Sequence, residues 1–170
     1  MALLKVVYYG QHPALHKVAE PVTVFDEQLK TLIQDMYETM YHEEGVGLAA
    51  PQVGIAKQIA VIDVSKEQNQ AFCIINPVII EKKGSQPMGA GCLSVPGTYD
   101  EVPRFTYVKV RAQDVTGKFF EIEGEELLGH CLQHEIDHLH GKVYIDYLSP
   151  LKRSRMLKKM QKCLRHGKEE

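Results

Sequence analysis

The chain has 170 residues, 20 of them Lys or Arg and 22 Asp or Glu, which gives a formal net charge of −2. This length is typical of one domain with a substantial core, and the hydrophobic content of 44% is that of an ordinary globular protein. The near-neutral charge argues against a protein that binds nucleic acid over its whole surface.

The cysteines and the absence of apolar runs predict a cytoplasmic protein that has no contact with membranes. The first residues lack a cationic start followed by a long apolar segment, and no run of about 18 apolar residues occurs. The four cysteines are far apart in the sequence and form no CxxC pair, which is typical of a reducing compartment. They are Cys73, Cys92, Cys131 and Cys163.

The first half of the chain predicts an extended segment, one helix and two strands. Residues 1–9 are apolar and are expected to enter the core in an extended conformation or as a short strand. From Asp26, a plausible N-cap, apolar residues recur every three or four positions and predict a helix that ends before Gly45. Residues 58–64 and 71–80 are rich in β-branched side chains and predict strands.

A glycine-rich segment at residues 45–54 allows two interpretations. The glycines alone favour a tight turn that needs positive φ. The alternative is a backbone that approaches a ligand closely, with Gln52 as a directed hydrogen-bond donor. The GK[ST] ending of a phosphate-binding loop is absent, so this is not a phosphate loop.

The second half predicts an exposed segment, a hairpin and two helices. Cys92 lies between glycines and a proline in residues 88–97, where the chain is expected to be exposed and shaped by its backbone. Residues 107–112 and 118–122 predict a hairpin across the turn at 114–117. A helix follows from Leu127 to Gly141, and Gly141 is a natural C-cap.

The C-terminal residues predict a basic amphipathic helix. Ser149 is the expected N-cap and Pro150 the first helical residue. Met156, Leu157, Met160 and Leu164 form an apolar stripe, and seven basic residues occupy the other faces. We expect residues 1–148 to form a single catalytic domain, and residues 149–170 to be a helix of that same domain.

The sequence HEIDH at residues 134–138 is the strongest chemical signal. On a helix, His134 and His138 lie one turn apart on the same face, about 6 Å along the axis, a distance that one metal ion can bridge. Glu135 points close to that face without being forced to ligate. This arrangement is typical of metal-assisted hydrolysis, in which a carboxylate moves the proton of the attacking water. The alternative is a surface helix that happens to carry two histidines.

A catalytic metal site needs a third protein ligand. Cys131 lies on the same helical face, but its seven-residue separation from His138 spans about 10.5 Å, too far for one ion. The metzincin pattern would place a third histidine where Tyr144 stands, and the basic tail offers glutamates only at its end. The ligand is therefore expected upstream, where Cys92 is the best candidate among residues that spacing leaves open.

With these segments in hand, the chain resembles the peptide deformylases. The resemblance rests on residues 45–52 (GVGLAAPQ), 91–94 (GCLS) and 134–138 (HEIDH), in the order of the family and with roughly its spacing. It implies an α+β fold in which β-sheets surround a central metal-binding helix, with a C-terminal helix. It also implies removal of the N-formyl group from the initiator methionine of nascent polypeptides, with release of formate.

The resemblance also implies a division of roles. Cys92, His134 and His138 would bind the metal, with Fe²⁺ as the physiological ion and Zn²⁺, Ni²⁺ or Co²⁺ in purified protein. Glu135 would be the acid–base residue, and Gln52 and the Leu93 N–H would stabilise the oxyanion. The expected substrate-binding residues, for N-formylmethionyl nascent peptides, are Glu44, Val46, Gly47, Met88, Gly91, Arg104, Leu127 and Cys131.

Two positions depart from the pattern of the family. Ala90 stands where a glutamate is usual, and His130 where an aliphatic residue is usual. Loss of the glutamate is expected to widen the mouth of the pocket, relax side-chain selectivity and leave Arg104 without an ion-pair partner. Asp137 is expected to be structural and to pair with a base such as Arg111.

Three further hypotheses concern partners and competing functions. The basic tail predicts either a solvated helix that packs on the domain or a contact with the ribosome, whose RNA presents many phosphates. A weakly active or altered-specificity relative of the deformylases is one competing interpretation. Another metal-dependent peptidase or amidase is the second, although a cysteine ligand argues against ordinary zinc proteases.

Overall fold

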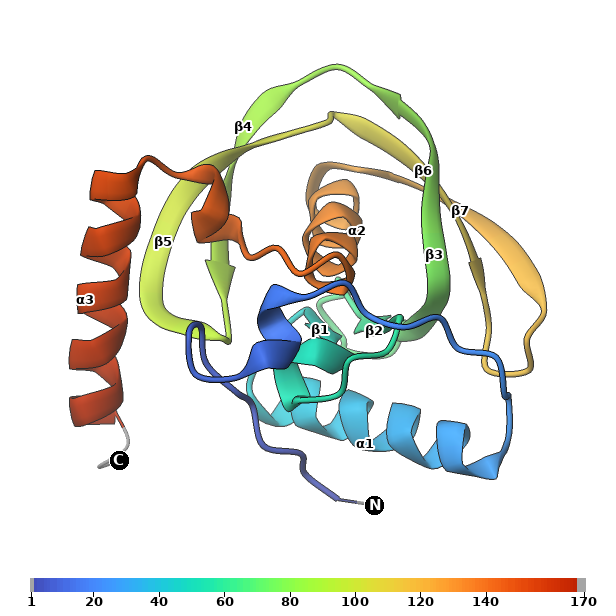
Figure 1. Cartoon of the computed structure of the whole chain (residues 1–170). Helices are drawn as coiled ribbons and strands as arrows, with labels where there is room; N and C mark the ends of the chain where they lie inside the picture. Colours follow the sequence, from blue (N-terminus) through green and yellow to red (C-terminus); the bar gives the residue numbers. More distant parts are fainter. Residues whose placement is uncertain (1, 168–170) are drawn as a thin grey trace.

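A central helix surrounded by β-structure dominates the fold (Figure 1). The computed structural model describes residues 2–167. Its α-helices are α1 (Glu27–His42), α2 (Glu126–Leu139) and α3 (Pro150–Gly167), and short 3₁₀ turns occur at η1 (Pro13–His16), η2 (Ala50–Val53) and η3 (Tyr144–Tyr147). The predicted α+β class, with the two histidines on a central helix and a further helix at the C-terminal end, is confirmed. Within the described residues, no helix has the length and apolar character needed to cross a membrane.

Two antiparallel sheets lie around α2. Five strands form the larger sheet in the order β1-β2-β3-β6-β7, and β4 pairs with β5 in a separate two-stranded sheet. The predicted hairpin is confirmed, because β6 and β7 pair from Tyr107↔Glu125 to Gln113↔Phe119. The strand bounds are β1 (Gly47–Ala49), β2 (Ile59–Ile62), β3 (Phe72–Lys83), β4 (Gln86–Cys92), β5 (Val95–Arg104), β6 (Tyr107–Gln113) and β7 (Phe119–Glu125).

A hairpin, β4–β5, surrounds Cys92, where the sequence predicted only an exposed segment shaped by its backbone. The two strands pair from Gln86↔Arg104 to Ala90↔Asp100, and after a shift of register Cys92 pairs with Val95. Cys92 therefore ends a strand and is half-buried. Several glycines and prolines in these strands conceal the usual strand signal, because both residue types are depleted in strands.

Helix α1 begins as the sequence predicts. The Asp26 side chain caps it by accepting a hydrogen bond from the Leu29 N–H at 3.0 Å. Its apolar stripe, which includes Ile33, Met36 and Met40, is buried against β1 and β2. The N-terminal segment is extended, as expected, and hydrogen-bonds through Val7 N–H to the Gln52 carbonyl at 2.8 Å.

Helix α2 is buried along most of its length. Its apolar residues, among them Leu132, Ile136 and Leu139, pack with side chains of β2, β3 and β6. Gly129 of α2 lies directly against Gly124 of β7, since a Cβ atom on Gly129 would be 2.8 Å from the Gly124 carbonyl oxygen. The absence of both side chains lets the helix dock by backbone contact.

Helix α3 packs its apolar stripe on the β4–β5 sheet. Met156 and Met160 are buried, with Leu157 and Leu164 partly buried beside them, in the same cluster as Val95 and Val102 of β5. Figure 1 shows the helix alongside β5. The predicted N-cap is confirmed, because Ser149 Oγ accepts a hydrogen bond from the Lys152 N–H at 3.2 Å.

Candidate metal centre and its cavity

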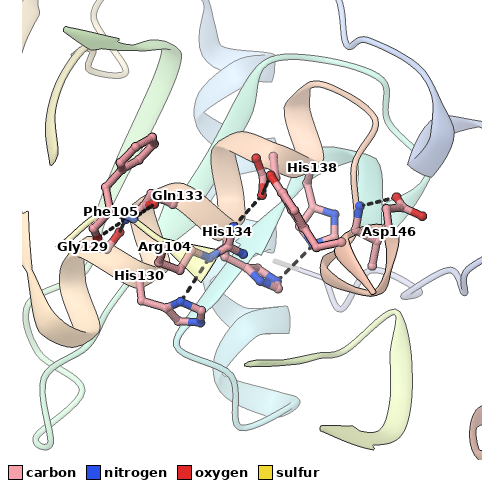
Figure 2. A network of polar contacts seen from close by, with 11 residues as sticks. Arg104, Phe105, Gly129, His130, Gln133, His134, His138 and Asp146 are labelled. Atoms are coloured by element: carbon pink, nitrogen blue, oxygen red, sulfur yellow. Dashed lines mark hydrogen bonds and ion pairs between the residues drawn. The ribbon is translucent and has the colours of Figure 1, made fainter. Parts of the chain in front are cut away.

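Three potential metal ligands converge from two parts of the fold. His134 and His138 lie one turn apart on α2, and Cys92 lies at the end of β4. The Nε2 atoms of the two histidines are 3.2 Å apart, and Cys92 Sγ is 3.4 Å from His138 Nε2. All three ligand atoms lie within 4.8 Å of one another. Figure 2 shows the rings of His134 and His138 turned toward one another.

These distances suit a tetrahedral ion. Bonds of about 2.3 Å to sulfur and about 2.0–2.1 Å to nitrogen put an S···N pair about 3.5 Å apart and an N···N pair about 3.3 Å apart. The distances of 3.4 Å and 3.2 Å in the structure are close to both. The three side chains therefore have the chemistry and the spacing to bind one divalent cation.

Burial keeps the three ligand side chains neutral in the metal-free protein. It lowers the pKa of His138 to about 3 and that of His134 well below its usual value. Burial also raises the pKa of Cys92 to about 12, although backbone N–H groups of Ser94 and Val95 oppose this effect. Neutral imidazoles are the form that binds metals, and a cation beside the thiol would remove its proton.

The Glu135 carboxyl group is held between α2 and the glycine-rich segment. A Cβ atom on Gly47 would lie 2.4 Å from Glu135 Oε2, so only glycine allows this close approach. Glu135 Oε1 is buried and has no hydrogen-bond partner among the described residues. Burial raises the pKa of Glu135 to about 8. Such a carboxyl group is poised to exchange a proton near neutral pH.

The structure confirms the predicted turn within residues 45–54, whereas close approach of this backbone to a ligand stays a prediction. Gly54 has a φ of 82° and ends η2, which is the predicted turn. Gly47 has no positive φ and instead lets the backbone approach Glu135. The turn and the close approach belong to different glycines of one segment.

The Gln52 side chain is oriented by its hydrogen bonds. Its Oε1 accepts from the Ala49 N–H at 2.9 Å, so Nε2 points the other way. Nε2 lies 3.4 Å from Cys92 Sγ and 3.4 Å from Ser94 Oγ. Gln52 is 1% exposed, and its donor group therefore sits in a fixed position beside the candidate metal ligands.

A cavity of about 530 Å³ opens on this site. We call it the metal-side cavity. Cys92, His134, Glu135, Gln52 and Leu93 all border it. The predicted substrate-binding residues that also border it are Glu44, Val46, Gly47, Gly91, Leu127 and Cys131.

Two predicted substrate-binding residues lie outside the wall of the metal-side cavity. Met88 lies in β4, paired with Val102. Arg104 is 4% exposed and is covered on the cavity side by His130, to which it is hydrogen-bonded. Sequence reasoning also missed Val6 and Tyr8, which border the cavity. No pattern in the N-terminal segment pointed to that position, because backbone hydrogen bonds place it there.

The expected ion pairs need correction. Asp137 pairs with Arg104, at 2.8 Å between Oδ2 and Nη1, and not with Arg111, whose guanidinium lies over the Phe119 ring. Arg104 is therefore not left unpaired by Ala90. The alanine is 1% exposed, packs in the cluster around β5 and does not border the metal-side cavity. The wider mouth and relaxed selectivity expected from the missing glutamate stay predictions.

Comparisons with known proteins agree with this geometry. A family model described as polypeptide deformylase matches residues 3–154. A peptide deformylase of Hahella chejuensis is 52% identical over 95% of this chain and 96% of its own length. One of Baumannia cicadellinicola is 46% identical over 98% of this chain and 99% of its own.

Solved structures give the same result. The crystal structure of a peptide deformylase from Legionella pneumophila has a TM-score of 0.95 at 48% identity and covers 99% of both chains. A peptide deformylase from Ehrlichia chaffeensis, solved in complex with actinonin, has a TM-score of 0.90 at 38% identity. It covers 95% of this chain and 98% of its own.

Proposed function

Since the chain belongs to the polypeptide deformylase family and is an enzyme that removes the formyl group of nascent peptides, we propose that the metal-side cavity is its active site. The observation that carries this proposal is the cluster of three ligand atoms within 4.8 Å beside the Glu135 carboxyl group. Cys92, His134 and His138 would hold the metal. A bound divalent cation would supply Lewis acidity to the attacking water and to the formyl oxygen.

Glu135 is the proposed acid–base residue. Its unpartnered Oε1 takes the proton of the attacking water as the formyl carbon is attacked, then delivers it to the departing amine. Gln52 Nε2 and the Leu93 N–H are the proposed donors to the developing oxyanion. The hydrogen bond from Ala49 that orients Gln52 supports this assignment, because a pre-oriented donor needs no rearrangement during the reaction.

The proposed peptide-binding mode is strand addition. β1 is an edge strand of the larger sheet, and β4 pairs only with β5 among the described strands. Val46 and Gly47 border the metal-side cavity at the start of β1, and Gly91 and Leu93 border it at the end of β4. An extended nascent peptide can therefore use backbone hydrogen bonds on either edge while its first side chain enters the cavity.

Fe²⁺ is the proposed resident ion, as the family resemblance implies. One thiolate and two imidazoles also suit Zn²⁺, Ni²⁺ and Co²⁺, so the ligand set does not select among them. Metal analysis of protein purified without oxygen identifies the native ion. Metal-free protein that is then loaded with each ion in turn ranks their activities.

The same preparation tests the proposed active site. We expect the metal-loaded enzyme to release formate from formyl-Met-Ala-Ser, to lose this activity on chelation and to regain it when metal is restored. Actinonin, which is bound by the relative from Ehrlichia chaffeensis, is expected to inhibit it. A protein that binds metal but releases no formate would contradict the proposal and favour a catalytically weak relative.

We also propose that α3 contacts the ribosome in the cytoplasm. Six basic residues of α3 are exposed, while its apolar stripe is buried. They are Lys152, Arg155, Lys158, Lys159, Lys162 and Arg165. The helix therefore presents a positive surface that ribosomal phosphates would attract. Deletion of α3 would remove Met156 and Met160 and uncover Val95 and Val102 of β5, so a change of charge is the cleaner test.

A charge-reversed α3 is expected to bind ribosomes less well. We expect the triple variant Lys158→Glu, Lys162→Glu, Arg165→Glu to co-sediment with ribosomes about tenfold less, because it replaces attraction to phosphates by repulsion. Its formate release from free peptides is expected to stay unchanged.

The matched control changes three exposed lysines elsewhere, Lys5, Lys66 and Lys118, to glutamate. This control has the same net charge as the α3 variant. Equal loss of co-sedimentation in both would show that overall charge, and not α3, is responsible.

A further inference from the structure

His130 is a polar residue in the wall of the metal-side cavity. It lies one turn before His134 on α2, between Leu127 and Cys131 in the same wall. It is 9% exposed, so its ring is largely enclosed by protein. The catalytic roles proposed above do not use it.

Arg104 determines which nitrogen of His130 carries the proton. The Arg104 Nε–H donates to His130 Nδ1 at 3.3 Å, as Figure 2 shows. Arginine has no acceptor, so Nδ1 presents its lone pair and the proton of the neutral ring is on Nε2. Burial and the charge of Arg104 lower the pKa of His130 to about 4, and the ring is therefore neutral at pH 7.

Arg104 is itself fixed in place. Its Nη1 pairs with Asp137 Oδ2 at 2.8 Å, and its guanidinium lies over the Tyr147 ring. The side chain is 3% exposed, so solvent does not compete for these contacts. The orientation of the His130 ring is thus maintained by an arginine that is itself held in a partly buried ion pair.

The Nε2–H of His130 remains available to a ligand. Within residues 2–167, no group accepts a hydrogen bond from it. Arg104 covers the Nδ1 edge and does not border the cavity, so the cavity is bordered by the rest of the ring. The neighbouring wall residues Leu127 and Cys131 offer no strong hydrogen-bond acceptor.

The first side chain of the substrate must lie near this donor. The metal ligands and Glu135 fix the position of the formyl carbon, and the first side chain begins three bonds away from it. His130 and Cys131 lie one helical turn from His134 along the same wall of the cavity. A first side chain as long as that of methionine, lying along this wall, therefore comes within reach of His130.

We propose that His130 is a specificity-determining residue that selects first side chains carrying a hydrogen-bond acceptor near their end. This proposal rests on the proposed function of the cavity. Methionine has a weak acceptor in its thioether sulfur, methionine sulfoxide has a strong one in its S=O oxygen, and norleucine has none. The expected order of preference at equal length therefore places the sulfoxide well above norleucine.

The test compares kcat/KM for formyl-methionine sulfoxide and formyl-norleucine tripeptides on the metal-loaded enzyme. We expect His130→Leu to lower the sulfoxide-to-norleucine ratio roughly threefold to tenfold, the contribution of one neutral hydrogen bond. His130→Gln is expected to keep most of the ratio, because its amide nitrogen can occupy the position of Nε2. A ratio that is equal in wild type and His130→Leu overturns the proposal.

Two controls separate selection from general damage. His140→Leu removes an exposed histidine at the end of the same helix and is expected to leave the ratio unchanged. Should His130→Leu fail to fold, His130→Asn takes its place, because its side-chain oxygen can accept from Arg104 while no donor reaches the Nε2 position. The same fall in ratio is expected, and no fall overturns the proposal.

A binding measurement distinguishes failure of this proposal from failure of the proposed function. Calorimetry with the unformylated tripeptides, which need no catalysis, is expected to show the same preference for sulfoxide over norleucine and its loss in His130→Leu. Absence of formate release with this preference present contradicts only the proposed function. Normal formate release without the preference contradicts only the role of His130.

Discussion

The Glu135→Ala variant is expected to keep its metal and lose nearly all formate release. Cys92, His134 and His138 are all retained in this variant, so metal content measured by elemental analysis should match that of wild type. The proton of the attacking water then loses its proposed acceptor beside the metal ligands, and general acid–base catalysis typically contributes about 10²–10⁴-fold. Retained activity would contradict the acid–base assignment.

A matched control for this variant is Glu125→Ala, at an exposed glutamate beside the N-terminal end of α2. It is expected to have full activity.

The metal-free proteins give a second readout, because burial raises the pKa of Glu135 to about 8. The folded state then binds more protons than the unfolded state between about pH 4.5 and 8, so stability falls as pH rises through that range. Metal-free Glu135→Gln should therefore be more stable than metal-free wild type at pH 7, by a margin that shrinks toward pH 4.5.

Cys92→Ala is expected to lose both metal and activity. Two histidines alone leave a catalytic ion one ligand short, and the β4 thiol lies 3.4 Å from His138 Nε2. Metal content after gel filtration and formate release should both fall to background. A Cys92→Ala protein that still holds one equivalent of metal would show that another residue is the third ligand.

Cys131→Ala is the control that decides between the two cysteines near the site. Both thiols border the metal-side cavity, but Cys131 is not among the three side chains whose ligand atoms converge. It is expected to keep its metal, with at most a change in KM through the wall of the cavity. Loss of metal from Cys131→Ala alone would reverse the assignment of the thiolate ligand.

Local patterns predicted the central helix and the placement of its two histidines on one face. The HEIDH pattern needs only helical geometry to place His134 and His138 together, and geometry also excluded Cys131 as a ligand of the same ion. The cap at Asp26 and the hairpin at residues 107–122 likewise depend on neighbours in sequence. The roles of these residues in catalysis stay predictions until the variants are measured.

Contacts between distant segments were beyond the reach of such patterns. The β4–β5 hairpin was missed because its glycines and prolines suppress strand propensity, and pairing with a partner strand overrides that propensity. The partner of Asp137 was misassigned because both Arg104 and Arg111 lie on strands, and only the packing of α2 decides which one is near. The position of the N-terminal segment beside the cavity depends on backbone hydrogen bonds, which the side-chain pattern of the sequence does not predict.

The contact between Gly124 and Gly129 makes this enzyme vulnerable at a site remote from its chemistry. A methyl group on Gly129 would have to push α2 away from β7, since its Cβ atom would lie 2.8 Å from the Gly124 oxygen. Helix α2 carries His134, Glu135 and His138 as one rigid body, whereas Cys92 is held by the hairpin on the other side. A displaced helix would thus move the two histidines away from Cys92. In random mutagenesis, substitutions at Gly129 would therefore abolish activity as completely as substitutions of a catalytic residue.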